Sequence, residues 1–60
     1  MNPEQIAEAL ADYAAKHFNP DDIVDEPMQD VLSDGWFFEF TKGETIYTVL
    51  VTTQAMDGAL

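Results

Sequence analysis

The sequence predicts an α+β fold in which one N-terminal helix packs on a small antiparallel sheet, in the order α-β-β-β. Residues 2–18 have the apolar spacing of an amphipathic helix, and residues 36–53 contain two β-rich runs separated by a glycine turn. A chain of 60 residues has room for one domain only. We therefore expect a single domain, 1–60, comprising a helix at about 3–18, an acidic connector at about 19–27, a sheet at about 28–53 and a tail at 54–60.

The helix is expected to begin with a strong set of capping residues. Asn2 is a good N-cap, Pro3 suits the first helical position, and Gln5 stands where a capping box requires Glu or Gln. Pro20 ends the helix, because the residue before a proline is disfavoured in the α region. The face expected to enter the core carries Ile6, Leu10, Tyr13, Ala14 and His17, with Ala7 and Phe18 at its margin. The opposite face carries Glu4, Gln5, Glu8, Asp12 and Lys16.

Three strands are expected after the connector. Residues 28–32 are predicted to form a strand at the sheet edge, where the adjacent Pro27 and the acidic side chains do least harm. Ser33, Asp34 and Gly35 are typical of a turn. Residues 36–41 and 45–53 are rich in aromatic and β-branched side chains, which favours two further strands.

A two-residue turn at Lys42-Gly43 is predicted to join the last two strands. Such a turn would pair Phe40 with Thr45, Phe38 with Tyr47 and Trp36 with Val49. The face expected to receive the helix then carries Trp36, Phe38, Phe40, Tyr47, Val49 and Val51. The other face carries Phe37, Glu39, Thr41, Ile46, Thr48 and Leu50.

Phe37, Ile46 and Leu50 would form an apolar patch on the sheet face away from the helix. Exposed apolar patches often mark interfaces. Three explanations remain open: a homodimer that buries the patch, a partner that docks on it, or coverage by the tail or by residues 20–30.

The hairpin has the features of a known type of module. The segment GWFFEFTKGETIYTVLVTTQAMDG combines a tryptophan, alternating apolar residues, a glycine turn, Tyr-x-Val-x-Val and a late glycine. In these features it resembles the C-terminal part of PepSY and cystatin-like modules. The resemblance implies a helix-on-sheet fold and no particular activity.

The charge balance is the most unusual property of the chain. Twelve Asp and Glu residues accompany two lysines and no arginine, giving a formal net charge of −10. Direct binding to nucleic acid or to an anionic bilayer is disfavoured, because both require Lys and Arg against phosphate. A basic protein is the favoured partner, and solubility alone is the competing explanation. No apolar run approaches the ~18 residues of a membrane span, and no signal peptide is expected.

Six carboxylates within fourteen residues form the predicted partner-binding site: Asp21, Asp22, Asp25, Glu26, Asp30 and Asp34. One interpretation is a solvated loop and edge strand whose charges prevent sheet-to-sheet pairing. The other is a surface that presents carboxylates where a basic groove expects phosphates, to be bound by arginines through charge-assisted hydrogen bonds. Glu39 and Glu44 on the hairpin, or Glu4, Glu8 and Asp12 on the helix, would extend this surface.

Other chemistries fit the sequence poorly. An EF-hand loop that began at Asp30 would have Leu32 in place of one ligand and Thr41 in place of the final glutamate. The absence of cysteine excludes disulfides and thiolate metal sites. General acid–base catalysis requires an acid in an apolar pocket, and these acids are expected to be exposed. We therefore expect a non-enzymatic protein with no catalytic residue, metal site or cofactor.

In small size, strong acidity and lack of arginine, the chain resembles the acidic DNA-mimic inhibitors of phages and mobile elements, including some anti-CRISPR and anti-restriction proteins. This resemblance is one of composition. It implies a small inhibitor that occupies a nucleic-acid-binding groove of a basic protein in the cytoplasm of a host cell. The alternative is an interaction module without mimicry, such as an immunity-type, adaptor or homodimeric accessory protein.

Overall fold

The N-terminal capping residues start the helix as the sequence predicts. In the computed structural model, which describes residues 1–56, helix α1 spans Pro3–His17. The Gln5 main-chain N–H donates to the Asn2 side chain, and the Asn2 main-chain N–H donates to the Gln5 side chain, each at 2.9 Å. These two bonds form the predicted capping box. Beyond the helix, Asn19 adopts the left-handed region (φ 54°) immediately before Pro20.

Replacing Asn2 with alanine tests the contribution of this cap. We expect Asn2→Ala to lower the free energy of unfolding by about 1 kcal/mol, because it leaves main-chain N–H groups of the first turn without a partner. Urea denaturation followed by circular dichroism measures the change. Gln54→Ala, in the segment after the last strand, is the control and is expected to change stability by less than about 0.5 kcal/mol. Equal stability of the two variants would show that the capping box contributes nothing.

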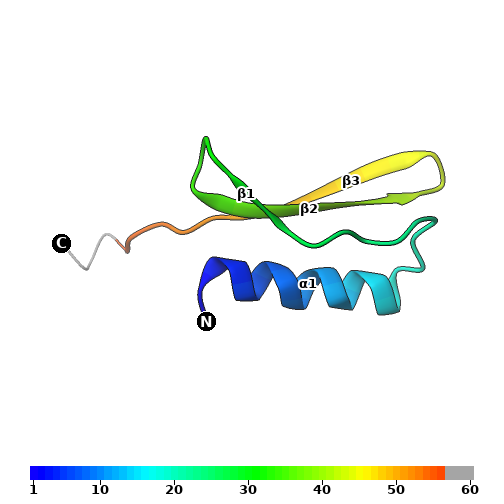
Figure 1. Ribbon diagram of the computed structural model, residues 1–60, viewed down its shortest axis with the longest axis horizontal. Helices are drawn as coiled ribbons and strands as arrows, with labels where there is room; N and C mark the ends of the chain where they lie inside the picture. Colours follow the sequence, from blue (N-terminus) through cyan, green and yellow to red (C-terminus); the bar gives the residue numbers. More distant parts are fainter. Residues whose placement is uncertain (57–60) are drawn as a thin grey trace.

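Three consecutive strands form one antiparallel sheet in the order β1-β2-β3, and Figure 1 shows α1 on one face of it. The strands are β1 (Met28–Asp30), β2 (Gly35–Lys42) and β3 (Thr45–Val51). This confirms the predicted α+β class and the order α-β-β-β. Strand β1 is shorter than the predicted 28–32, because the Asp30 carboxylate accepts hydrogen bonds from the Leu32 main chain and the Ser33 hydroxyl and so starts the turn early.

The predicted register of the β2–β3 hairpin is wrong by two residues. The turn residues are Gly43 and Glu44, both with positive φ (58° and 70°), as a two-residue type I′ turn requires. The observed pairs are Phe40 with Tyr47, Phe38 with Val49 and Trp36 with Val51, in place of the predicted Thr45, Tyr47 and Val49 partners. A shift of two residues leaves every side chain on its predicted face, because side chains alternate along a strand.

The helix meets the sheet through alanines, which corrects the predicted core face. Buried side chains are Ala7, Ala11, Ala14 and Phe38, with Val24, Phe40 and Val49 packed around them. The large residues expected in the core, Leu10 and Tyr13, are 42% and 53% exposed. Ile6, His17 and Phe18 are exposed as well. The small side chains of the three alanines let the helix approach Phe38 closely. Leu10 and Tyr13 lie to one side of this row of alanines.

The connector, residues 19–27, covers the edge of β2 that the short β1 leaves unpaired. The Asp21 main-chain N–H donates to the Thr41 carbonyl oxygen at 2.8 Å, and the Asp21 carboxylate accepts from the Gly43 N–H at 2.9 Å. Lys42 Nζ donates to the Asn19 carbonyl oxygen at 2.8 Å. Figure 1 shows the chain returning from the end of α1 alongside the sheet towards β1. In residues 1–56, the two edge strands are β3, with seven residues, and β1, with only three.

No helix in residues 1–56 combines the length and the apolarity that a membrane crossing needs.

Candidate protein-binding surface

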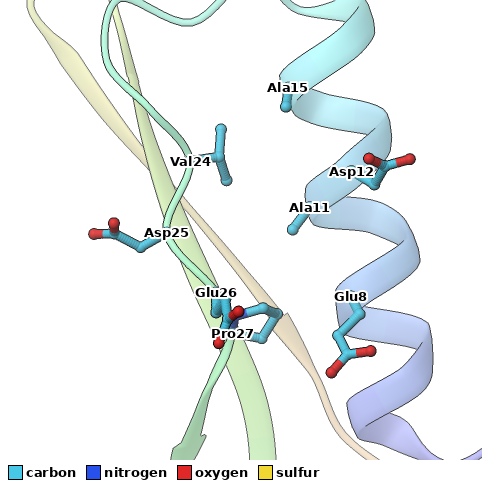
Figure 2. Close-up of a pocket in the computed structure, with 8 residues that line it drawn as sticks. All are labelled: Glu8, Ala11, Asp12, Ala15, Val24, Asp25, Glu26 and Pro27. Atoms are coloured by element: carbon cyan, nitrogen blue, oxygen red, sulfur yellow. The ribbon is translucent and has the colours of Figure 1, made fainter.

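A groove between α1 and the connector is lined by acidic side chains (Figure 2). Its walls are Glu8, Ala11, Asp12 and Ala15 from the helix, and Val24, Asp25, Glu26 and Pro27 from the connector. Figure 2 shows the Val24 side chain directed towards the helix and the Asp25 carboxylate directed away from it. The packing of half-buried Val24 against the core therefore holds the connector in place and turns Asp25 towards solvent.

The two central connector acids also border the sheet. A smaller hollow on the other side of the connector is lined by Asp25 and Glu26 together with Met28, Phe37, Phe38 and Glu39. Asp25 and Glu26 thus lie between the acids of the helix and the acid of strand β2. We call the set formed by Glu8, Asp12, Asp25, Glu26 and Glu39 the acidic side of the molecule.

Neutralisation by lysine is minimal on this surface. Lys16 Nζ lies 2.9 Å from the Asp12 carboxylate, and both side chains are largely exposed to water. Lys42 donates to a main-chain oxygen and makes no ion pair within residues 1–56. In that same part of the chain, the Lys16–Asp12 pair is the only salt bridge. The exposed Lys16–Asp12 pair contributes only about 0–1 kcal/mol and involves one of the five acids of the acidic side. The other four acids keep their negative charge for a partner.

The structure separates the six predicted site residues into three groups. Asp25 and Glu26 lie on the acidic side and line the same groove as Glu8 and Asp12, with the Asp25 carboxylate directed away from the helix. The carboxylate of Asp21 holds the hairpin turn, and its neighbour Asp22 is exposed beside it.

Asp30 and Asp34 belong to the β1–β2 turn, where Asp30 accepts two local hydrogen bonds and Asp34 adopts a positive φ of 57°. The β1–β2 turn and the β2–β3 hairpin turn lie at opposite ends of the sheet in Figure 1. The predicted site is therefore not one contiguous patch. Asp25 and Glu26, in the middle of the predicted set, share a groove with Glu8 and Asp12 of the helix, which the sequence predicts only as an extension of the site.

The apolar patch on the open face of the sheet is present. Phe37 pairs with Leu50 across β2 and β3, and with Met28 across β2 and β1. Leu50 is 49% exposed and Ile46 is 67% exposed. In residues 1–56, neither the connector nor the chain after β3 covers these two side chains; residues 57–60 of the expected tail lie outside the described part.

Among the described residues, no group of three or more His, Asp or Glu side chains is placed to hold a metal ion. No protein-family model, curated protein or solved structure matches this chain. The acidic side and the apolar patch are the two surface features that bear on function.

Proposed function

We propose that this protein is a small acidic inhibitor that binds a basic, nucleic-acid-binding surface of a target protein and thereby excludes nucleic acid. It acts by binding and catalyses no reaction. The observation that carries the proposal is the acidic side, where Glu8, Asp25 and Glu26 line one groove and none of them pairs with a cation within residues 1–56. In small size, strong acidity and lack of arginine the chain resembles acidic DNA-mimic inhibitors, including those of the anti-CRISPR and anti-restriction type.

The spacing of charge along the connector supports mimicry of a phosphate backbone. Asp21, Asp22, Asp25 and Glu26 lie within six residues, a length that spans at most about 18 Å. Neighbouring charges on the connector are therefore at most about 6 Å apart on average, less than twice the roughly 3.4 Å spacing of phosphates along one DNA strand. Glu8 and Asp12, one helical turn apart on α1, form a second row across the groove. An arginine-lined groove could bind both rows through bidentate hydrogen bonds.

Competition with nucleic acid tests this function. A target captured from a host lysate is titrated with labelled DNA or RNA in the presence and absence of this protein. We expect the protein to displace the nucleic acid from its site, and we expect its own binding to weaken steeply as salt is added. A target that binds nucleic acid and this protein at the same time would contradict mimicry.

Removing two charges from the acidic side should slow association with the target. We expect Asp25→Asn combined with Glu26→Gln to reduce the association rate at low salt by roughly three- to tenfold, because the electrostatic steering is weaker. Stopped-flow or surface-based kinetics measure the rate. Asp34→Asn combined with Glu44→Gln is the matched control, because it removes the same charge from the two turns at the ends of the sheet. Equal slowing by both double variants would assign the effect to net charge and would remove the groove from the interface.

An interaction module without mimicry is the second candidate, and the apolar patch of Phe37, Ile46 and Leu50 favours it. Such a module would use the same acidic side chains together with this patch. Its complex would be compatible with nucleic acid bound to the partner, so the competition experiment separates the two candidates.

A further inference from the structure

Among residues 1–56, strand β3 presents an unpaired main-chain edge. Two-residue hairpin turns close with a hydrogen-bonded pair, here Lys42 and Thr45. Because hydrogen-bonded and non-hydrogen-bonded pairs alternate in an antiparallel ladder, the main-chain groups of Ile46, Thr48 and Leu50 point away from β2. On the opposite side of the sheet the edge strand β1 is only three residues long, and beyond it the connector bonds to β2 at Thr41. The N–H and C=O groups of β3 can be satisfied either by water or by another strand.

The charge distribution leaves this edge neutral. None of the seven residues of β3 is charged, although the chain as a whole has a net charge of −10. Natural edge strands usually carry charges, prolines or bulges that prevent pairing. The other edge strand, β1, is short, follows Pro27 and ends in Asp30, whereas β3 has none of these features. A second negatively charged copy could therefore approach β3 with less repulsion than at the acidic side.

An apolar stripe of the helix lies on the same side as β3. Ala11 and Ala15 border the groove towards the connector. The apolar stripe lies on the other side of the buried alanines and therefore faces β3. Aromatic contacts trace this side: Tyr13 meets Phe18, Phe18 meets Phe40, and Phe40 stacks on Tyr47 of β3 with 5.2 Å between ring centroids. The stripe consists of Ile6, Leu10 and Tyr13, which are 37%, 42% and 53% exposed.

From the free edge, its neutrality and the adjacent apolar stripe, we propose that two copies of this chain associate through antiparallel pairing of β3 with β3, centred on Thr48. This register is the only one that pairs all seven residues of Thr45–Val51 with their counterparts. It places Thr48 opposite Thr48 of the other copy as a hydrogen-bonded pair, Ile46 opposite Leu50 on the open face, and Tyr47 opposite Val49 on the helix face. Every cross-strand pair is uncharged.

The same arrangement brings the helices together. Strands lie about 4.8 Å apart in a sheet. Because α1 contacts both β2 and β3, the two helix axes would lie about 10 Å apart, which is the upper end of the 8–10 Å found between packed helices. Each apolar stripe would then meet its counterpart. Glu8, Asp12, Asp25 and Glu26 would lie towards the two outer edges of the six-stranded sheet, while Glu39, which accepts a hydrogen bond from the Thr48 hydroxyl at 3.2 Å, would lie one strand in from the pairing. The proposal is independent of the inhibitor function and leaves the groove accessible.

The oligomeric state of two chains tests the proposal. We expect sedimentation equilibrium to give twice the 6.7 kDa mass of the chain for the native protein. We expect Thr48→Pro to give the mass of the single chain with its helical circular dichroism retained, because the Thr48 N–H points away from β2 and is not used within the monomer. A monomeric native protein over the whole accessible concentration range would overturn the proposal, as would a Thr48→Pro variant that remains a dimer.

A cysteine variant decides the geometry even if the proline variant fails to fold. The chain has no cysteine of its own, so Thr48→Cys introduces a single thiol. Hydrogen-bonded pairs across antiparallel strands have Cα atoms about 5.5 Å apart, within the 4.4–6.8 Å range of disulfides. We expect rapid and complete cross-linking under mild oxidation, while Ser33→Cys in the exposed β1–β2 turn stays largely uncross-linked. In a dimer that packed face to face through the apolar patch, the two sheets would be about 10 Å apart, which is too far for a disulfide between two copies of the Thr48→Cys variant. Failure of Thr48→Cys to cross-link faster than Ser33→Cys would overturn the proposed pairing.

Discussion

Replacing Phe38 with alanine is expected to unfold the monomer at room temperature. Phe38 is 3% exposed and is the only large side chain in the buried set of residues 1–56, which otherwise consists of Ala7, Ala11 and Ala14. Truncating a buried phenylalanine costs about 3–5 kcal/mol. A single core in a domain of this size rarely supplies more than about 3–5 kcal/mol of net stability. The two quantities are similar, so the Phe38→Ala chain should lose its helical circular dichroism and its dispersed amide resonances.

The adjacent Phe37 provides a matched control. It is the same residue type in the same strand, but its side chain lies on the open face and is only half-buried. We expect Phe37→Ala to remain folded and to lose about 1 kcal/mol, since only part of the full 1.5–3 kcal/mol of a buried apolar side chain is at stake. If the two variants are equally stable, the helix does not pack on the face that carries Phe38.

Adding one methyl group at Gly35 is expected to have the next largest effect. A Cβ atom at this position would lie 2.6 Å from the Val51 carbonyl oxygen and 3.0 Å from the Thr52 Cγ2 atom. Real Cβ atoms essentially never approach another atom within 3.0 Å, so the main chain at the end of β3 must shift. Overpacking of this kind costs about 1–3 kcal/mol. Gly35→Ala should therefore show a clear fall in the midpoint of urea denaturation.

The hairpin glycine is the control for this substitution. Gly43 has a φ of 58°, and a Cβ atom added there would have no neighbouring atom within 4 Å, so only its backbone conformation limits the choice of residue. Asparagine tolerates the left-handed region, and Gly43→Asn is expected to change stability by less than about 0.5 kcal/mol. An equally small effect of Gly35→Ala would mean that the end of β3 moves freely away from β2.

The local features of this fold could be predicted because they depend on short stretches of sequence. Asn2, Pro3 and Gln5 determine where the helix starts, and alternating aromatic and β-branched residues determine β2 and β3. The hairpin register could not be predicted, because it depends on Glu44 adopting a positive φ that glutamate normally avoids.

The core face of the helix could not be predicted either, for a different reason. Residue size favours burial of Leu10 and Tyr13, whereas tertiary packing favours close contact between Ala11, Ala14 and Phe38. The periodicity of apolar residues does not predict how closely a helix approaches a sheet. The proposed pairing of two copies offers a reason why the large side chains of α1 stay at the surface of one chain.

The sequence predicts which acidic residues are concentrated in the connector, but not which of them lie side by side in the folded chain. The sequence places Asp21 and Asp30 in the same set as Asp25 and Glu26, but Asp21 and Asp30 make the hydrogen bonds that shape two turns. Short acidic residues before turns commonly bond to the main chain, and this competing role is visible only once the turn positions are known. The contribution of Glu8 depends on which side of the helix the connector returns, and only the tertiary structure shows that.

The neighbouring order β1-β2-β3 has a consequence for how fast this protein forms. Each strand pairs with the strand next to it in the chain through a short turn, so assembling the sheet closes only short loops. Topologies rich in such local pairings fold faster than those dominated by non-local pairings. We expect rapid-mixing experiments to show a single fast refolding phase for the bulk of the molecules, and a minor slow phase in those whose prolines have isomerised while unfolded.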